Sequence, residues 1–149
     1  MRMIIGGAFQ GKTDYAKRTY PGIDWADGRV CPYDVIRTCG GICHLEAYIR
    51  RVMQEEEGQY LKLLDSLARI NPGIVVISDE IGYGLVPMDA FERRYRETVG
   101  RICTRLAADA KQVDRVVCGI GTTIKKEKVQ KEQIDEDERS DRAGREYQV

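Results

Sequence analysis

The feature that most limits what this chain can fold into is a glycine-rich segment near its N-terminus. Residues 6–13 read Gly-Gly-Ala-Phe-Gln-Gly-Lys-Thr, which fits the spacing G-x-x-x-x-G-K-[ST] without a gap. The apolar run Met3-Ile4-Ile5 precedes it and can form a buried strand, and the residues after Thr13 can open a helix. A phosphate-binding loop requires this order of strand, loop and helix.

The residue types in this segment explain the chemistry that it predicts. Glycines let the backbone turn tightly and bring its N–H groups close to an anion, and a helix N-terminus adds to that positive nest. Lys12 is expected to reach the β- and γ-phosphates, and Thr13 to hold Mg²⁺ through its hydroxyl. We therefore predict that GTP or ATP binds with Mg²⁺ at Gly6, Gly7, Ala8, Phe9, Gln10, Gly11, Lys12 and Thr13. The alternative is an ordinary glycine-rich turn after an edge strand.

Length and charge exclude several other classes of protein. A chain of 149 residues is expected to form one domain with a real core. Lys and Arg total 24, as do Asp and Glu, so there is no global electrostatic case for nucleic-acid or membrane binding. No apolar run approaches the ~18 residues of a membrane span, and the glycine loop begins too early for a secretory signal peptide. We therefore expect a cytoplasmic protein.

The five cysteines, an odd number, are expected to be reduced thiols. Cys39, Cys43 and His44 lie close together in the sequence and could suggest a metal site. Their spacing contains no C-x-x-C pair, and the chain has no second histidine. This pattern favours ordinary buried or half-buried cysteines over zinc ligands.

The spacing of apolar residues predicts most of the remaining elements. Apolar runs predict strands over residues 74–78 and 113–120. Steps of three and four residues predict helices over residues 13–20, 42–54, 59–70 and 88–110. Residues 23–28 resemble a turn, and a further strand is expected to start at Arg29. The alternation of strands and helices behind a phosphate loop indicates an α/β fold.

We therefore expect a P-loop NTPase-like, mostly parallel sheet with helices on both faces, in a domain that spans residues 1–124. From residue 125 to residue 149 the composition changes, because acids and bases are densely mixed and apolar residues become sparse. This segment is expected to be a charged C-terminal tail, either flexible or a solvated helix, with few residues in the core.

Two acidic residues follow the most apolar predicted strand. Asp79 and Glu80 come directly after the run Ile74-Val75-Val76-Ile77-Ser78. The carboxyl end of a central parallel strand lies beside the phosphate loop in an open α/β sheet. We expect Asp79 or Glu80 to orient Mg²⁺ or to activate a hydroxyl group. The alternative is that one of them caps the turn that follows.

The second half of the chain carries a family resemblance. Residues 78–87, Ser-Asp-Glu-Ile-Gly-Tyr-Gly-Leu-Val-Pro, are followed by Phe-Glu-Arg-Arg-Tyr-Arg-Glu at 91–97 and by Gly100-Arg101. These residues resemble the adenosylcobinamide kinase/adenosylcobinamide-phosphate guanylyltransferase family, which reads approximately S/T-N-E-V-G-x-G-I-V-P and then R-x-F/Y-R-D/E. The family's phosphate loop, T-G-G-A-R-S-G-K-S, is similar to residues 5–13. Its last strand, followed by S-G-I and a basic residue, is similar to residues 116–125.

The chain also departs from the family pattern. It is shorter than usual, and two of the family's strands, Y-I-A-T after the first helix and D/E-C-x-T in the middle, have no clear counterpart. Asp79 stands where the family has Asn, and Cys103 and Arg105 stand near the family's preferred Asn. These departures fall in the substrate region and at the metal side of the expected site.

The resemblance implies an activity, a substrate and an assembly. It implies a kinase that uses a nucleoside triphosphate to phosphorylate adenosylcobinamide, a corrinoid of cobalamin biosynthesis. It also implies transfer of GMP from GTP through a guanylylated histidine, and a homo-oligomer, typically a trimer. The phosphate-loop motif and the acidic end of the apolar strand lead us to expect Lys12 and Glu80 in the catalytic site and Thr13 and Asp79 at the metal.

His44 is the one candidate for the nucleotidyl carrier. The family's histidine lies in an R-I-x-x-H-x-x-x-R context, and the loose counterpart here is Gly41-Ile42-Cys43-His44 before an arginine-containing helix. A neutral imidazole can attack an α-phosphate, and Arg50 and Arg51 are expected to neutralise the pyrophosphate. On a helix that starts at Ile42, these arginines and Glu46 lie away from the apolar stripe. The alternative is a histidine that caps the helix or lies on the surface.

Two other functions stay open on the sequence. A degenerate family member could act as a nucleotide-binding regulatory or assembly module, which the shortened middle of the chain favours. A small P-loop kinase for a different alcohol is the other alternative, since the substrate region is reduced.

Overall fold

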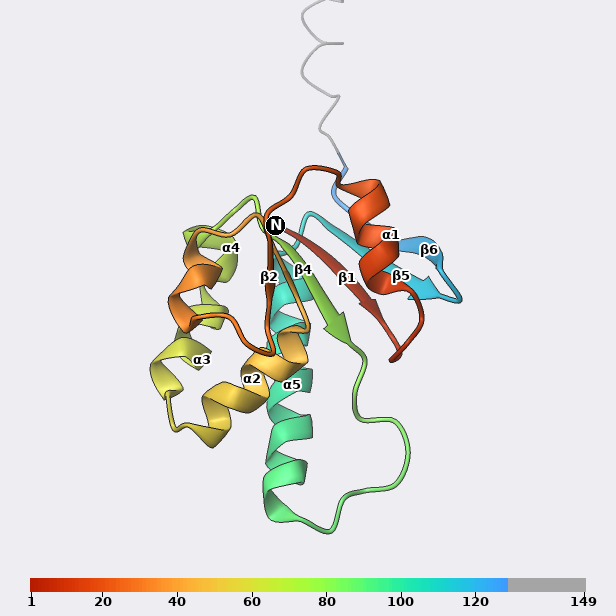
Figure 1. Ribbon diagram of the computed structural model, residues 1–149. Helices are drawn as coiled ribbons and strands as arrows, with labels where there is room; N and C mark the ends of the chain where they lie inside the picture. Colours follow the sequence, from red (N-terminus) through yellow and green to blue (C-terminus); the bar gives the residue numbers. More distant parts are fainter. Residues whose placement is uncertain (129–149) are drawn as a thin grey trace, which may run out of the picture.

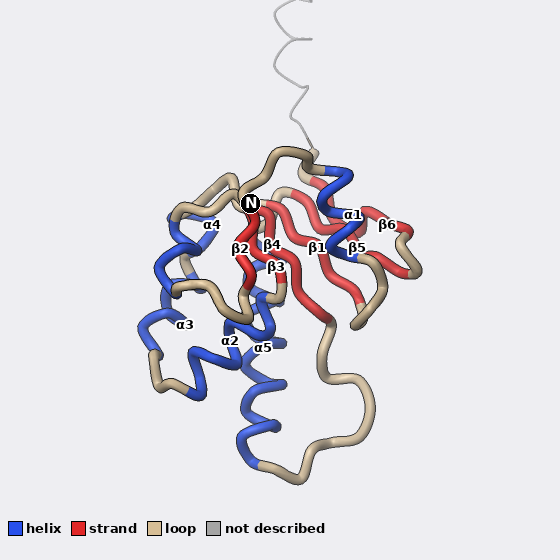
Figure 2. The backbone as a smooth tube through the Cα atoms, in the orientation of Figure 1, coloured by secondary structure: helices blue, strands red, loops and turns tan. Residues whose placement is uncertain are grey.

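The computed structural model describes residues 1–128, and the predictions for the rest of the C-terminal tail lie outside these residues. Within them, six strands form one sheet in the order β2-β3-β4-β1-β5-β6 (Figures 1 and 2). Five strands are parallel, and β6 pairs antiparallel with β5. The strands are β1 (Arg2–Gly6), β2 (Trp25–Asp27), β3 (Gly41–Cys43), β4 (Val75–Asp79), β5 (Gln112–Val117) and β6 (Ile120–Lys126).

Helices cover both faces of this sheet, as the sequence predicts. The helices are α1 (Lys12–Thr19), α2 (Leu45–Gln54), α3 (Gly58–Asp65), α4 (Leu67–Ile70) and α5 (Ala90–Asp109), with a 3₁₀ helix at Tyr33–Arg37. Helix α1 packs on one face, where Ile4, Ile77 and Ala16 belong to one buried cluster. The other helices pack on the opposite face, against Met3 and Val76. The expected α/β fold with a mostly parallel sheet is therefore confirmed.

The two central strands are apolar on both faces because side chains alternate along a strand. In β1, Met3 and Ile4 are each 1% exposed, although they point to opposite faces. In β4, Val75, Val76 and Ile77 are likewise buried. A strand covered on both faces is typical of the middle of a parallel sheet. The continuous run of apolar residues that results allowed β1 and β4 to be predicted from the sequence.

The prediction for residues 23–31 is wrong. Residues 25–27 form β2 rather than a turn, and no strand starts at Arg29, because residues 28–31 turn sharply. The N–H groups of Val30 and Cys31 both donate to the carbonyl of Asp27, at 3.1 and 2.8 Å. Strand β2 is three residues long and pairs only with β3. Its stability therefore comes from pairing with a distant segment, which local residue preferences do not reveal.

The helix expected over residues 42–54 begins later, at Leu45. Residues 41–43 form the strand β3, which directly precedes this helix. In the same way, the strand β2 follows helix α1. Gly41 lies under the ring of Trp25, where a Cβ atom would approach ring carbons to 2.5 Å. Trp25 thus lies over the β2–β3 pair, and the lack of a side chain at Gly41 allows this contact. The helix expected over residues 59–70 divides at Ser66 into α3 and α4.

The strand expected over residues 113–120 is instead a hairpin. Cys118 and Gly119, with φ of 50° and 75°, form the two-residue connection between β5 and β6. Two successive residues with positive φ are typical of a type I′ hairpin turn. Strand β6 continues to Lys126, two residues beyond the expected end of the domain at residue 124. No helix within residues 1–128 is long and apolar enough to cross a membrane.

Candidate active site

The carboxyl ends of the parallel strands meet at one edge of the sheet. The phosphate loop follows β1, Asp79 ends β4, and His44 directly follows β3. Together they line a pocket of about 300 Å³, formed by residues 8–14 with Arg29, His44, Ile77 and Asp79. Ligands of open α/β sheets bind at this edge. The structure therefore brings most of the predicted site residues to one place.

Glycines give the phosphate loop its shape. Gly11 has a φ of 84°, a left-handed conformation that favours glycine, and its carbonyl accepts the first backbone hydrogen bond of α1, from Tyr15, at 3.0 Å. Gly6 lies so close to β5 that a Cβ atom would come within 2.4 Å of the Val116 carbonyl oxygen. Both positions require glycine for steric reasons, so the motif is more than a flexible turn.

The β5–β6 turn holds the phosphate loop from the side. The Gly119 N–H donates to the Gln10 carbonyl at 2.7 Å, and the Cys118 N–H donates to the Gln10 side-chain oxygen at 2.8 Å. These bonds join segments that are more than one hundred residues apart in the sequence. Phe9, at the tip of the loop, has a φ of 57° and a fully exposed side chain.

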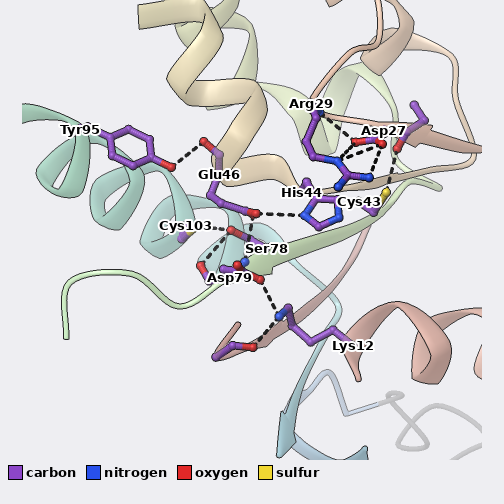
Figure 3. Close-up of polar contacts among 12 residues, drawn as sticks. Lys12, Asp27, Arg29, Cys43, His44, Glu46, Ser78, Asp79, Tyr95 and Cys103 are labelled. Carbon is purple, nitrogen blue, oxygen red and sulfur yellow. Dashed lines mark hydrogen bonds and ion pairs between the residues drawn. The ribbon is translucent and has the colours of Figure 1, made fainter. Parts of the chain in front are cut away.

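Lys12 lies between the loop and β4. Its side chain is nearly buried, its Nζ atom lies 2.6 Å from the Asp79 Oδ1 atom, and it donates to the Gly7 carbonyl at 2.7 Å (Figure 3). Asp79 thus lies beside the phosphate loop and Lys12, as the sequence predicts. Thr13 and Asp79, the predicted metal ligands, both line the pocket and offer the hard oxygen donors that Mg²⁺ prefers.

Glu80 lies beside this pocket rather than in its lining. Arg115 of β5 binds it with two hydrogen bonds, from Nε at 2.8 Å and from an Nη atom at 3.1 Å. These bonds hold the pKa of Glu80 below its usual value. The Glu80 backbone N–H also donates to the Gly6 carbonyl at 2.8 Å. Glu80 lines a second pocket, of about 380 Å³, under the loop that joins β4 to α5. Its predicted catalytic role stays a prediction.

His44 occupies an unusual backbone position. Its φ of 55° and ψ of 50° are left-handed, and its carbonyl accepts the first hydrogen bonds of α2, from the N–H groups of Ala47 and Tyr48. Gly28 packs against this carbonyl, so that a Cβ atom there would lie 2.2 Å from the oxygen. A left-handed residue other than glycine is uncommon and often marks a functional site. The His44 side chain is about one-third exposed and lines the pocket.

The arginines expected beside His44 are engaged elsewhere. Arg50 forms an ion pair with Glu92 and lies over the ring of Tyr95. Arg51 donates to the carbonyls of Gly28 and Cys31 at 2.9 Å and so fixes the loop after β2. Neither residue lines the pocket.

Arg29 is the pocket arginine that sequence reasoning missed. Its guanidinium binds both carboxylate oxygens of Asp27, at 2.8–3.1 Å, and these hydrogen bonds lower the pKa of Asp27. A bidentate pair of this kind fixes the direction of the guanidinium. The signal was the sequence Asp27-Gly28-Arg29 at the end of a strand, which was hidden because β2 itself was not predicted.

Asp27, Cys43 and His44 form a small group of metal-ligand types, with one atom of each within 4.8 Å of the others. Arg29 already binds both oxygens of Asp27, and burial raises the pKa of the Cys43 thiol. Cys39, which the sequence placed with this group, is instead buried in the core. We assign no metal to these residues.

Comparison with known proteins decides the family. The model of the family described as cobinamide kinase / cobinamide phosphate guanyltransferase matches residues 42–124, which is more than half of the chain. The chain belongs to this family. The cobinamide kinase match includes His44, Asp79 and Glu80, whereas the phosphate loop precedes the matched residues. The family resemblance predicted from the sequence is therefore confirmed.

Two curated relatives of the cobinamide kinase family are each named bifunctional adenosylcobalamin biosynthesis protein CobU. The protein from Salmonella typhimurium is 40% identical and that from Escherichia coli 38% identical, each over 63 residues. The aligned part is 42% of this chain and 35% of each relative. This chain thus matches about a third of the length of the curated cobinamide kinase relatives.

Proposed function

We propose that this protein is a nucleoside-triphosphate-dependent kinase that phosphorylates a hydroxyl group of a cobinamide-type corrinoid, with adenosylcobinamide as the expected acceptor. The observation that carries the proposal is the single pocket in which the phosphate loop, Lys12, Asp79 and His44 converge. The family match and the names of the two relatives support the choice of acceptor.

The proposed reaction is an in-line transfer of the γ-phosphoryl group. The loop N–H groups bind the phosphates, and Lys12 leaves Asp79 to contact the β- and γ-phosphates. The acceptor O–H gives its proton to Nε2 of His44 while its oxygen forms a bond to the γ-phosphorus. The bond between that phosphorus and the β–γ bridging oxygen breaks, which yields a phosphate ester and a nucleoside diphosphate. Catalysis comes mainly from positioning and from neutralised charge.

Thr13 and Asp79 would hold Mg²⁺ in this site, since both line the pocket and both offer oxygen donors. Magnesium, when bound, neutralises negative charge on the β- and γ-phosphates. Labelling with both ATP and GTP decides which nucleotide is the phosphoryl donor.

A second reaction at His44 is supported by the family. The lone pair on Nε2 would attack the α-phosphorus of GTP, forming an N–P bond as pyrophosphate leaves. The phosphate of the phosphorylated corrinoid would then attack that phosphorus and break the N–P bond, which joins GMP to the corrinoid and frees His44. Arg29, rather than Arg50 or Arg51, is the guanidinium that lines this pocket and would contact the leaving pyrophosphate.

The loop between β4 and α5 is where we place the body of the acceptor. Its side chains at Tyr83, Leu85 and Val86 are at least 75% exposed, and Arg96 holds the carbonyls of Tyr83 and Leu85. An exposed apolar group on a held backbone is suited to a large, partly apolar substrate. We expect Leu85→Asp to raise the KM for the corrinoid about tenfold and to leave nucleotide affinity unchanged.

The experiment that tests the proposal uses α-labelled and γ-labelled GTP and ATP with Mg²⁺, with and without adenosylcobinamide. Wild type is compared with His44→Ala and with the exposed-residue control Lys17→Ala. We expect γ-label on the corrinoid with wild type and with the control. Acid-labile α-label on the protein, absent from His44→Ala, supports the second reaction.

Other outcomes decide between the remaining functions. Nucleotide binding with no labelled product would overturn the kinase proposal in favour of a nucleotide-binding regulatory or assembly module. Transfer of γ-label to another alcohol, but not to the corrinoid, indicates a kinase of different specificity. A trimeric assembly and a cytoplasmic location also stay predictions, to be checked by light scattering and by cell fractionation.

A further inference from the structure

We propose that Glu46 is a positioning residue that fixes the tautomer of His44, so that Nδ1 carries the proton and Nε2 keeps its lone pair. The consequence for turnover rests on the proposed function of His44. The tautomer itself is a property of the folded chain and can be measured without any substrate.

The first observation is the burial of the Glu46 carboxylate. Glu46 lies in the first turn of α2, is only 8% exposed, and was expected on the outer face of that helix. Burying a carboxylate is costly unless its oxygens receive hydrogen bonds. A buried charge at this point therefore needs partners, and the structure provides them.

Each oxygen of Glu46 faces a different partner (Figure 3). Oε2 accepts a hydrogen bond from the backbone N–H of Asp79 at 3.0 Å, and Oε1 lies 3.3 Å from Nδ1 of His44. The backbone carbonyl of Glu46 accepts a hydrogen bond from the hydroxyl of Tyr95 at 2.8 Å. Strand β4 and helix α5 thus hold Glu46 in place, and one oxygen remains directed at the imidazole.

These contacts determine which ring nitrogen carries the proton. An ionised carboxylate only accepts hydrogen bonds, so the nitrogen that faces it must be a donor. In a neutral imidazole, one nitrogen is the donor and the other the acceptor. If Nδ1 donates to Glu46, Nε2 must hold the lone pair. This lone pair is the one that the proposed reactions need.

Lys12 and His44 are also linked through the same strand end. Lys12 pairs with the side chain of Asp79, whose backbone N–H binds Glu46, which in turn binds His44. The carboxyl end of β4 therefore sets the position of both the phosphate-binding lysine and the histidine. Glu46 does not line the pocket and would act only through His44.

The test is ¹⁵N NMR spectroscopy of the histidine ring, which is unambiguous because the chain contains one histidine. Spectra are recorded at a pH of about 9, where an ordinary imidazole is neutral. We expect wild type to show the Nδ1–H tautomer, although a free imidazole side chain in water prefers Nε2–H. A wild-type spectrum of the Nε2–H form would overturn the proposal, whatever any variant does.

Glu46→Gln sharpens the test because glutamine has one acceptor oxygen where glutamate has two. If that oxygen keeps the Asp79 N–H, the amide NH₂ faces Nδ1 and reverses the tautomer to Nε2–H. Glu56→Gln, at an exposed position just beyond α2, is the matched control and should keep the wild-type spectrum. An unchanged tautomer in a folded Glu46→Gln protein would count against the proposal.

Turnover separates positioning from a purely structural role. With the wrong tautomer, we expect Glu46→Gln to lower kcat by about 10²–10⁴-fold while the KM for nucleotide and the melting temperature change little. A large fall in melting temperature with an unchanged tautomer would show a structural role instead. If the tautomer reverses but neither wild type nor control phosphorylates the corrinoid, the proposed function fails and the assignment of Glu46 stands.

Discussion

Two left-handed corners lead from strands into helices at the edge of the sheet, and they use different residues. The corner before α1 has Gly11 at φ 84°, and the corner before α2 has His44 at φ 55°. Glycine adopts this conformation without strain, whereas any other residue in it raises the free energy of the folded state by about 1–2 kcal/mol. The first corner offers backbone N–H groups, and the second offers a side chain.

The difference suggests a division of labour between the two corners. A corner that binds phosphate needs close approach to the backbone, so a side chain at Gly11 would obstruct it. A corner that transfers protons or phosphoryl groups needs a functional group in a fixed position. Placing His44 in the left-handed conformation costs stability, and such strain persists where surrounding contacts and function maintain it.

The largest effect expected at the first corner comes from its lysine. Lys12→Ala removes the charge that is proposed to contact the β- and γ-phosphates, and we expect kcat/KM to fall about 10²–10³-fold. Steady-state kinetics with the corrinoid measures this, and exposed Lys17→Ala in the same helix is the control. Equal, small effects of both substitutions would break the assignment of the first corner to phosphate binding.

The second prediction concerns the stability of the first corner. Gly11→Ala adds a Cβ atom at positive φ, 3.2 Å from the Cα atom of Gly119. We expect the free energy of unfolding to fall by about 1–2 kcal/mol, as measured by urea denaturation. Gly73→Ala is the control, because no atom lies within 4 Å of the added Cβ and its φ is not positive. A Gly11→Ala protein as stable as wild type would contradict the steric argument.

At the second corner, replacing the left-handed residue by glycine should raise the free energy of unfolding rather than lower it. His44→Gly relieves a left-handed strain of about 1–2 kcal/mol but increases the entropy of the unfolded chain, by about 0.4–1 kcal/mol. Because the His44 side chain is about one-third exposed, water can replace it as the partner of Glu46 Oε1, and we expect a net gain in unfolding free energy of about 0.5 kcal/mol, with loss of the activity proposed for the imidazole. Denaturation and the labelling assay are run on the same preparation. A destabilised His44→Gly protein would show that the imidazole holds the fold together.

The smallest effect concerns the ion pair beside the first corner. Arg115 lowers the pKa of Glu80 from its ordinary value of 4.5. The pair therefore stabilises the folded protein above pH 4.5, and this contribution is lost as the pH falls through the lower pKa of the folded state. We expect Arg115→Ala to lower the unfolding free energy by less than ~1 kcal/mol at neutral pH, since Arg115 is half exposed.

Denaturation as a function of pH measures this difference. The curves of wild type and Arg115→Ala should converge below pH 4.5, and added salt should narrow the gap at neutral pH. A gap that widens in acid would have the wrong sign for a carboxylate whose pKa is lowered. Such a result would show that the ion pair between Arg115 and Glu80 does not stabilise the protein beside the first corner.

The sequence predicts the first corner better than the second, for physical reasons. The phosphate loop and the doubly buried strands β1 and β4 depend on local patterns of glycine and apolar residues. Strands β2 and β3 are three residues each, and their stability depends on partners far away in the sequence. His44 was recognised as a candidate, yet its partner Glu46 was placed on the outer face, because the contacts that bury Glu46 come from Asp79 and Tyr95, which are far away in the sequence.

The hairpin of β5 and β6 is a second part of the fold that the sequence did not predict. Strand β6 is missed because most of its residues are exposed, so it shows no apolar run that would mark a strand. The Cys118–Gly119 turn lacks the Asn-Gly or Asp-Gly sequence that most often signals a tight hairpin. Asp79 was correctly expected near Lys12, because that expectation rests on where parallel strands end.

The attachment of Gln10 to the β5–β6 turn has a thermodynamic consequence. A phosphate loop that is already held on one side loses little conformational entropy when a nucleotide orders it. Calorimetry of nucleotide binding should therefore show a small entropic penalty. Gln10→Ala, which removes the side-chain bond to Cys118, should make that penalty larger while leaving every direct phosphate contact in place. The β5–β6 hairpin would thus contribute to affinity although its turn does not line the pocket.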